Sequence, residues 1–573
     1  MLLADILHHD FWRFVLGRFV AKHWLRGSVI VALHLAALAT MVLTEVDLLG
    51  WTLFLLTWIV INCVFIVLFG RPGISAAISL TLFGAIVVLS QFKSAVLWMT
   101  ITFFDILVVD SDTIAFLLST FPDLRTTVVI ATLIGIPLLV LIWRLDPFRI
   151  PRWIATVSGT ACFLFIAGMS FHVPEHPSEP FQGVNHVSNF ARSGVTSVYE
   201  LWTKGWLDAD GASPDNLRLA ASEPCQPVSK PPHIIMVLDE ASFDITAVPG
   251  VKVPPDYARH FQSVDGKTRS LVVEGSGGPT WYTEYNVLTG LSARSYGRLS
   301  FYVTRIAAGR VERGLPQALR RCGYKTITLY PAYGAFLSAR RFQASAGVQR
   351  LVDSSEMKAG DLEPDSFFYD QALRMIESEG SEQPLFLFVY TVFNHFPWWT
   401  RPRPDLTPDW RDLGNHPEVD EYIRRQTMSA SAYADFKQRL QRDYPGESFL
   451  VLRFGDHQPG LSAKIVDPSA TDAEISRRIM TYDMRYFTTY YAIDTVNFQP
   501  KDMSVALERL EATYLPLVLQ EAAGLPLDPS FAEQKKILAR CHGLFFSCAG
   551  GTEARRFNRL LIDAGLIKGM VSR

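Results

Sequence analysis

Five long apolar runs dominate the first third of this 573-residue sequence. Each comes close to the roughly 20 apolar residues that an α-helix needs to cross the hydrocarbon core of a membrane. The runs occupy residues 28–48, 52–70, 74–91, 126–144 and 153–171. Buried helices of a water-soluble protein imitate such a run once or twice, so five nearly uncharged runs predict five transmembrane helices.

The charges in the connecting loops predict which side of the membrane each loop faces, because Lys and Arg in short loops stay in the cytoplasm. Basic residues precede the first run and fill the second and fourth loops, whereas the alternate loops carry acidic residues such as Glu45 and Asp105. With the N-terminus inside and an odd number of spans, everything after residue 171 is expected outside the cytoplasm.

Two apolar segments do not fit a simple span. Residues 1–27 lack a compact apolar core followed by a small-residue cleavage site, which favours an amphipathic helix on the cytoplasmic face over a removed signal peptide. Residues 97–121 are apolar but carry three Asp, which indicates an interfacial or re-entrant segment. A sixth span there is the alternative, and it would invert the topology.

The rest of the chain divides into a linker and a globular domain. Residues 172–230 are Pro-rich in places, with a helix expected near 188–206, and are typical of a linker between the transmembrane domain at 28–171 and a globular domain. Residues 231–573 alternate short apolar β-rich runs with helical stretches. This alternation predicts an α/β domain with a mostly parallel central sheet.

Cysteines and net charge add two weaker constraints. Four of the six cysteines lie in the outer part of the chain, in a compartment that permits disulfides, and Cys541 and Cys548 are the expected pair. The formal charge of −2 gives no indication of nucleic-acid binding.

Polar groups follow three of the expected strands directly. "HIIMVLDEASFD" ends on Asp239 and Glu240, "LFLFVYTVFNHFPWW" leads to Asn394 and His395, and "FLVLRFGDHQPG" presents Asp456 and His457. Ligands of open α/β sheets bind beyond the carboxyl ends of the strands. These side chains are therefore expected to converge at one edge of the sheet.

Two further stretches bring a hydroxyl group and arginines. In "EGSGGPTWYTEYNVLTGL" the glycines allow close backbone approach, and Thr280 falls at the start of an expected helix. Thr280 is either an N-cap or a reactive group beside a bound anion. The strand at 325–330 leads through a loop to Arg340 and Arg341.

The combined set suits metal-assisted phosphoryl chemistry. Two carboxylates, a hydroxyl and an imidazole suit Mn²⁺ or Zn²⁺; they come from Glu240, Thr280, Asp456 and His457. A divalent cation lowers the cost of forming an alkoxide, so Thr280 would become the nucleophile. His395 would bind phosphate or move protons, and Arg340 would hold a phosphate oxygen.

At this point the motifs resemble a known family. The order "LDEASFD", "GGPTWYTEYNVLTG", "SARRF", "FNHFPWW", "FGDHQPG" is similar to that of the membrane-anchored, sulfatase-like phosphotransferases of the alkaline phosphatase superfamily, especially lipoteichoic acid synthase and the phosphoglycerol transferases of periplasmic glucans. The resemblance implies a multi-pass protein of the bacterial inner membrane with an extracytoplasmic, alkaline phosphatase/sulfatase-like catalytic domain.

The resemblance also implies a set of site residues. It implies one divalent metal ion, Mn²⁺ first, with Zn²⁺ or Mg²⁺ as alternatives, held by Glu240, Thr280, Asp456 and His457. It makes Thr280 the nucleophile and places His395 in catalysis. The substrate contacts that it implies come from Arg340, Asn394 and His395.

The activity that the resemblance implies is a two-step transfer. Thr280 takes a phosphoglycerol head group from a membrane phospholipid and passes it to a hydroxyl of a glycan or lipid acceptor. The alternatives are a phosphoethanolamine transferase acting on lipid A or another envelope glycan, and a catalytically silent membrane scaffold. A true sulfatase is disfavoured, because those enzymes place a modifiable Cys or Ser, followed by Pro and Arg, where "GGPTWYT" has Thr280.

Several residues depart from the family pattern or leave an alternative open. Ala241 follows Glu240 where the family commonly has Ser, so Asp239 is an alternative ligand, and Phe396 stands where a glycine is common. Arg341 is the alternative to Arg340, and Asn394 would otherwise only orient its loop. Three tryptophans serve either for packing or as glycan platforms: Trp281, Trp398 and Trp399.

Overall fold

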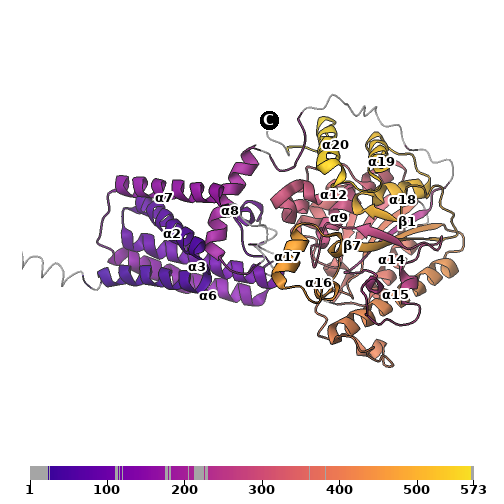
Figure 1. The fold of residues 1–573 in the computed structure, drawn as a ribbon, viewed down its shortest axis with the longest axis horizontal. Helices are drawn as coiled ribbons and strands as arrows, with labels where there is room; N and C mark the ends of the chain where they lie inside the picture. The colour runs from indigo at the N-terminus through magenta and orange to yellow at the C-terminus, as the bar shows by residue number, and fades with distance from the viewer. Residues whose placement is uncertain are drawn as a thin grey trace, which may run out of the picture. The chain divides into compact units, whose positions relative to one another are not determined.

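A computed structural model of the chain divides into two compact units, Met1–Trp202 and Thr203–Arg573 (Figure 1). The structure describes residues 24, 26–97, 99–109, 114, 117–118, 121–173, 179, 182–203, 205–211, 225, 230–360, 362–380 and 383–569. The helix predicted for residues 1–27 lies almost wholly outside the described residues.

The N-terminal unit is helical. Among the described residues, five helices are long and apolar enough to cross a membrane, as the sequence predicts. They are Arg26–Thr44, α2 (Leu48–Phe69), α3 (Pro72–Leu97), α6 (Pro122–Leu145) and α7 (Arg152–His172). α2 and α7 pack closely because Gly159 has no side chain: a Cβ there would stand 2.9 Å from the Cβ of Cys63.

Two shorter helices belong to the same unit. α4 (Phe103–Val108) lies in the apolar segment at 97–121 and is too short to span a membrane. Part of that segment lies outside the described residues, so the choice between a re-entrant segment and a sixth span stays a prediction. α8 (His186–Thr203) falls inside the predicted linker, close to the helix expected at 188–206.

The C-terminal unit is built on a mostly parallel sheet, which confirms the predicted fold class. The order of the eight strands described is β4-β3-β5-β1-β6-β7-β2-β8, and β7 alone runs antiparallel to both of its neighbours. The strands are β1 (His233–Asp239), β2 (Arg269–Val272), β3 (Lys325–Leu329), β4 (Arg350–Val352), β5 (Leu385–Tyr390), β6 (Phe449–Gly455), β7 (Thr488–Val496) and β8 (Arg509–Glu511).

Helices cover both faces of this sheet. On one face α14 and α15 pack against alternate residues of β1, β3, β5 and β6, including Ile235, Ile327 and Val451. α9 and α18 lie on the opposite face (Figure 1). The helices of the unit are α9 (Thr280–Thr289), α10 (Val303–Ala307), α11 (Leu315–Arg321), α12 (Ala339–Ser345), α13 (Ser354–Met357), α14 (Asp365–Glu379), α15 (Pro417–Asp443), α16 (Ser462–Val466), α17 (Asp472–Met480), α18 (Leu515–Ala523), α19 (Pro529–Cys541) and α20 (Thr552–Asp563).

Two disulfides cross-link the C-terminal unit. Cys541 and Cys548 are bonded, as the sequence predicts, and Cys225 is bonded to Cys322. Structural disulfides persist in oxidising compartments, so both bonds fit a domain outside the cytoplasm. Cys63 and Cys162 of the N-terminal unit remain free thiols.

Candidate active site

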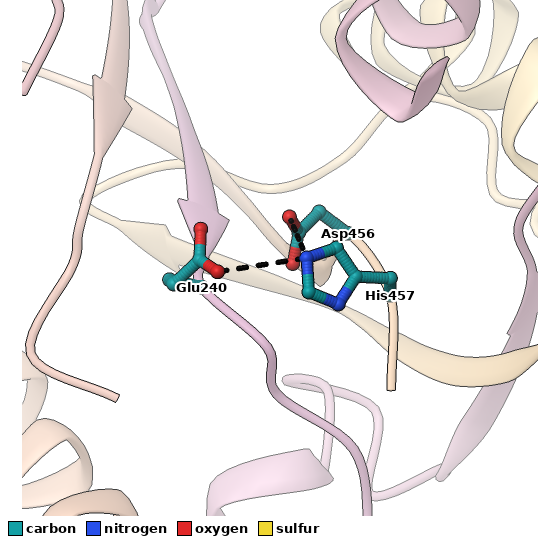
Figure 2. A group of neighbouring side chains, drawn as sticks. All are labelled: Glu240, Asp456 and His457. Carbon is teal, nitrogen blue, oxygen red and sulfur yellow. Dashed lines mark ion pairs between the residues drawn. The ribbon is translucent and has the colours of Figure 1, made fainter. Parts of the chain in front are cut away.

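Three side chains meet at the carboxyl ends of the two central strands, β1 and β6. Glu240 follows β1, and Asp456 and His457 follow β6. One ligand atom from each residue lies within 4.8 Å of the other two, and all three residues are buried. Figure 2 shows the carboxylates of Glu240 and Asp456 turned toward the same ring nitrogen of His457, Nε2. The sequence placed these groups at strand ends, and the parallel pairing of β1 with β6 brings them together.

The backbone around these residues allows the close approach. A Cβ on Gly455, the last residue of β6, would stand 1.8 Å from the carbonyl oxygen of Ser242, so the β1 and β6 loops can touch there only through a glycine. Ala241 has φ of +49°, a conformation that costs a non-glycine residue about 1 kcal/mol or more. This turn directs the amide of Ala241 to Asp456 Oδ1, at 2.8 Å.

Thr280 starts α9 and reaches the same place from the glycine-rich loop. Its Oγ1 lies 3.4 Å from His457 Nε2. The loop is held against the residues after β6, because the amide of Gly277 donates to the carbonyl of Gln458 at 3.0 Å. One turn along α9, Thr283 Oγ1 donates to the carbonyl of Asp456 at 2.6 Å. The helix therefore fixes both its own Thr280 and the backbone of Asp456.

The ring of His457 is oriented by its other nitrogen. Nδ1 donates to the carbonyl of Gln458 at 2.9 Å, which leaves Nε2 with its lone pair turned toward the carboxylates. The amide nitrogen of the Gln458 side chain donates in turn to the carbonyls of Arg485 and Thr488, at 2.8 and 2.7 Å. A histidine held in this way is typical of metal sites.

The separations from His457 fit those between ligands of a single tetrahedral ion. Two ligands about 2.1 Å from one ion at the tetrahedral angle stand about 3.4 Å apart. His457 Nε2 lies 3.3 Å from Asp456 Oδ2, 3.5 Å from Glu240 Oε1 and 3.4 Å from Thr280 Oγ1. Both of these carboxylate oxygens are buried without a hydrogen-bond partner among the described residues. The donor set and its spacing thus fit a divalent cation.

The electrostatic environment of the group also favours a bound cation. Burial raises the pKa of the Glu240 carboxyl well above its ordinary value, and the nearby carboxylates of Asp456 and Asp239 raise it further. A positive charge at the centre of the group would stabilise the ionised form. Asp239, the alternative ligand, accepts hydrogen bonds instead from His260 Nε2 at 2.8 Å and Tyr490 Oη at 2.6 Å. Burial opposes ionisation of Asp239, yet the bond from His260 leads the effects that bring its pKa below the ordinary value.

The loop after β5 carries Asn394 and His395. Asn394 is buried, and its side-chain nitrogen donates to Gln426 Oε1 at 2.9 Å. His395 Nδ1 donates to the carbonyl of Phe396 at 2.9 Å. Burial lowers the pKa of His395, and its hydrogen bond to the carbonyl of Phe396 opposes that shift.

Arg340 is engaged away from the group. Its guanidinium donates to the carbonyl of Leu351 at 2.7 Å, to Asp353 Oδ2 at 2.8 Å and to Glu356 Oε1 at 3.1 Å. These partners lie in or just after the edge strand β4, so a contact between Arg340 and a substrate would compete with two carboxylates. The structure therefore gives Arg340 a structural set of partners, and its binding role stays a prediction.

Three residues hold the site in place without having been predicted from the sequence: Thr283, Gln458 and Arg425. Thr283 and Gln458 position Asp456 and His457, and Arg425 of α15 binds the loop that carries His395. Thr283 had a signal, because it lies three residues after Thr280 and so on the same helix face. Arg425 had none, since its partners are backbone carbonyls about 30 residues away in the sequence.

Part of the chain that carries the site matches a known protein family. Residues 267–486 match the family model described as Sulfatase. The matched segment lies within the C-terminal unit. Thr280, His395, Asp456 and His457 fall inside this segment, and Glu240 precedes it.

The individual proteins similar to this chain share a low sequence identity with it. A Rhizobium meliloti protein named for the modification of cyclic β-1,2-glucan is 24% identical over 40% of this chain and 36% of its own length. The capsular polysaccharide biosynthesis protein RkpI of the same organism is 26% identical over 41% of this chain and 43% of its own. The chain thus matches less than half the length of either relative. The solved structure of the Streptococcus pyogenes phosphoglycerol transferase GacH aligns over 63% of this chain and 88% of its own, with 17% identity and a TM-score of 0.46.

Proposed function

We propose that the protein is a membrane-anchored, metal-dependent phosphotransferase. It takes a phosphoglycerol head group from a phospholipid of the bacterial inner membrane and passes it to a hydroxyl of an envelope glycan. The observation that carries the proposal is the threonine hydroxyl at a helix start, 3.4 Å from the imidazole of a buried Glu240, Asp456 and His457 group. A hydroxyl beside a group of metal ligands can act as a nucleophile. A phosphodiester is an electrophile that such a nucleophile attacks.

In the first half-reaction the oxygen of Thr280 attacks the phosphorus of the phospholipid. The bond from phosphorus to the diacylglycerol oxygen breaks, and diacylglycerol leaves with a proton. In the second half-reaction an acceptor hydroxyl attacks the phosphorus of the glycerophospho-threonine and restores the Thr280 hydroxyl. His395, on the neighbouring loop, is the group that we assign to proton transfer at the leaving and entering oxygens.

Glu240, Thr280, Asp456 and His457 would hold the metal, for which Mn²⁺ is our first choice. When bound, the ion lowers the pKa of a ligating hydroxyl and offsets negative charge on phosphoryl oxygens. Thr283 and the amide of Ala241 hold Asp456, while the carbonyl of Gln458 orients His457. The chain thereby preorganises the nucleophile before substrate binds.

The substrate classes are suggested by the anchor and by the relatives. Five helices able to span a membrane would keep the catalytic domain beside its lipid donor. The two disulfides support a position outside the cytoplasm. The named roles of both relatives, in glucan modification and capsular polysaccharide synthesis, favour a glycan acceptor. The glycerol head group is the choice that the sequence resemblance implies.

The test is diacylglycerol release by the full-length protein in vesicles that contain phosphatidylglycerol or phosphatidylethanolamine. We expect release from phosphatidylglycerol, and loss of about 10³-fold or more in the Thr280→Ala variant, because the nucleophile is gone. Thr280→Ser keeps a hydroxyl and is the matched control. Diacylglycerol release from phosphatidylethanolamine alone would identify phosphoethanolamine, and not phosphoglycerol, as the transferred group. Diacylglycerol release by Thr280→Ala at the rate of the unmodified protein would refute the assignment of Thr280 as the nucleophile.

A further inference from the structure

The three tryptophans near the site have different environments. Trp281 and Trp398 are each 8% exposed, and their indole N–H groups donate to the carbonyls of Phe301 and Asn394. Both are therefore packing residues. Trp399 is 71% exposed, and no ring contact or hydrogen bond of its side chain appears within the described part of the chain. An exposed indole of this kind has no role in the core.

The backbone of the loop that carries Trp399 is held by a buried arginine. Arg425, fully buried on α15, donates to the carbonyl of His395 at 2.7 Å and to those of Pro397 and Thr400 at 2.8 Å. The guanidinium also donates to Glu421 Oε1 at 2.7 Å, so its charge is paired. A buried arginine therefore binds the backbone on both sides of Trp399. The backbone at Trp399 is held in place, so a ligand that binds there has to order the side chain but not the loop.

A second exposed ring lies on the same loop, beside His395. The ring of Phe396 stacks on that of His395, with centroids 4.4 Å apart and planes inclined by 30°. Phe396 is itself 37% exposed. Phe396 and Trp399, here called the aromatic rim, are thus two exposed rings on the loop that carries the predicted proton-transfer residue.

We propose that the aromatic rim binds the pyranose rings of the acceptor glycan, which makes it an acceptor subsite of the transferase proposed above, on which this inference rests. The apolar C–H face of a sugar ring matches an exposed aromatic face. The hydroxyls need polar partners, and the same region offers two exposed ion pairs, Arg401 with Asp412 at 2.6 Å and Arg403 with Asp405 at 2.8 Å. Four charged groups are costly to place in hydrocarbon, so they favour a glycan over the bilayer as occupant.

The experiment compares the full-length protein with its Trp399→Ala and Trp399→Phe variants, using cyclic β-1,2-glucan as the probe. Glucan binding is measured by calorimetry, and KM is measured for both glucan and phosphatidylglycerol. Loss of one stacking contact corresponds to a rise of about tenfold in the glucan Kd and KM for Trp399→Ala. Trp399→Phe keeps a ring and should recover most of this loss. Leu406→Ala, 45% exposed on the same loop, is the matched control.

The result that supports the rim is a rise in the glucan KM about tenfold larger than the rise in the lipid KM. Equal glucan Kd values for the unmodified protein and Trp399→Ala would overturn it, as would a larger effect on the lipid KM, which would assign the rim to the membrane. If glucan binding depends on Trp399 but the protein transfers no head group, the proposed function is wrong and the rim is not. If the protein transfers the head group with a glucan KM independent of Trp399, the rim is not the acceptor subsite and the proposed function stands.

Discussion

Replacing Glu240 by Gln should have opposite effects on the protein with and without metal. Without metal, Glu240 is a buried carboxylate beside Asp456 and Asp239, and burial followed by these two charges raises its pKa. The substitution removes a like charge, so the unfolding temperature of the C-terminal unit should stay the same or rise. With Mn²⁺ present, the same substitution removes one of the charged ligands.

The magnitude is set by ligand linkage. An ion at 100 times its Kd stabilises the folded state by about 2.7 kcal/mol, which for a domain of this size is about 3 °C to 4 °C. We expect this shift in the unmodified protein and none in Glu240→Gln at the same Mn²⁺ concentration. The assay is differential scanning calorimetry of the full-length protein with and without Mn²⁺, joined to measurement of bound metal after gel filtration.

Glu511→Gln is the matched control, because Glu511 is also buried but bonds to the amide of Phe546 and to Ser547. The control should keep the full Mn²⁺ shift. The reasoning is refuted if Glu240→Gln still shows the shift and the bound metal, or if Glu511→Gln loses both.

Two further predictions concern stability. Arg425→Met should destabilise the C-terminal unit by about 3–5 kcal/mol, since three carbonyls and Glu421 lose a buried charged partner; Arg439→Met, at a half-exposed pair with Asp370, should cost less than about 1 kcal/mol. Denaturant titration of both variants checks this, and equal losses would contradict it. Burial raises the pKa of Glu511 to about 7 from an ordinary value of 4.5. The folded state therefore holds a proton that the unfolded state releases, so the contribution of Glu511 is present below pH 4.5 and lost as pH rises through 7. Glu511→Gln should be more stable than the unmodified protein at pH 8, by at most about 3 kcal/mol, with the difference shrinking toward pH 5. A difference independent of pH would contradict it.

The sequence predicted the elements that carry long apolar runs. β1, β5 and β6 are buried along their whole length, and their residues form almost continuous apolar segments. The short strands β4 and β8, of three residues each, leave no such pattern. They exist because a neighbouring strand offers hydrogen bonds, which is tertiary information.

Side-chain direction was the part of the site that the sequence could not supply. Asp239 and Glu240 are adjacent carboxylates, and the turn at Ala241 decides that Glu240 faces the site while Asp239 bonds to His260. The same holds for the neighbours Trp398 and Trp399, of which one packs and one is exposed. Asp239 bonds to Tyr490 and Trp398 packs against Tyr422, and both of these partners lie far away in the chain.

The central claim is that the oxygen of Thr280 takes up a phospholipid head group. Its most direct test is mass spectrometry of the peptide that contains Thr280, after the full-length protein is incubated with phosphatidylglycerol in the absence of any acceptor. We predict a glycerophosphoryl adduct on Thr280 in the unmodified protein and none in Asp456→Asn. An unmodified Thr280 in a preparation that releases diacylglycerol, or an adduct on another residue, would contradict the account.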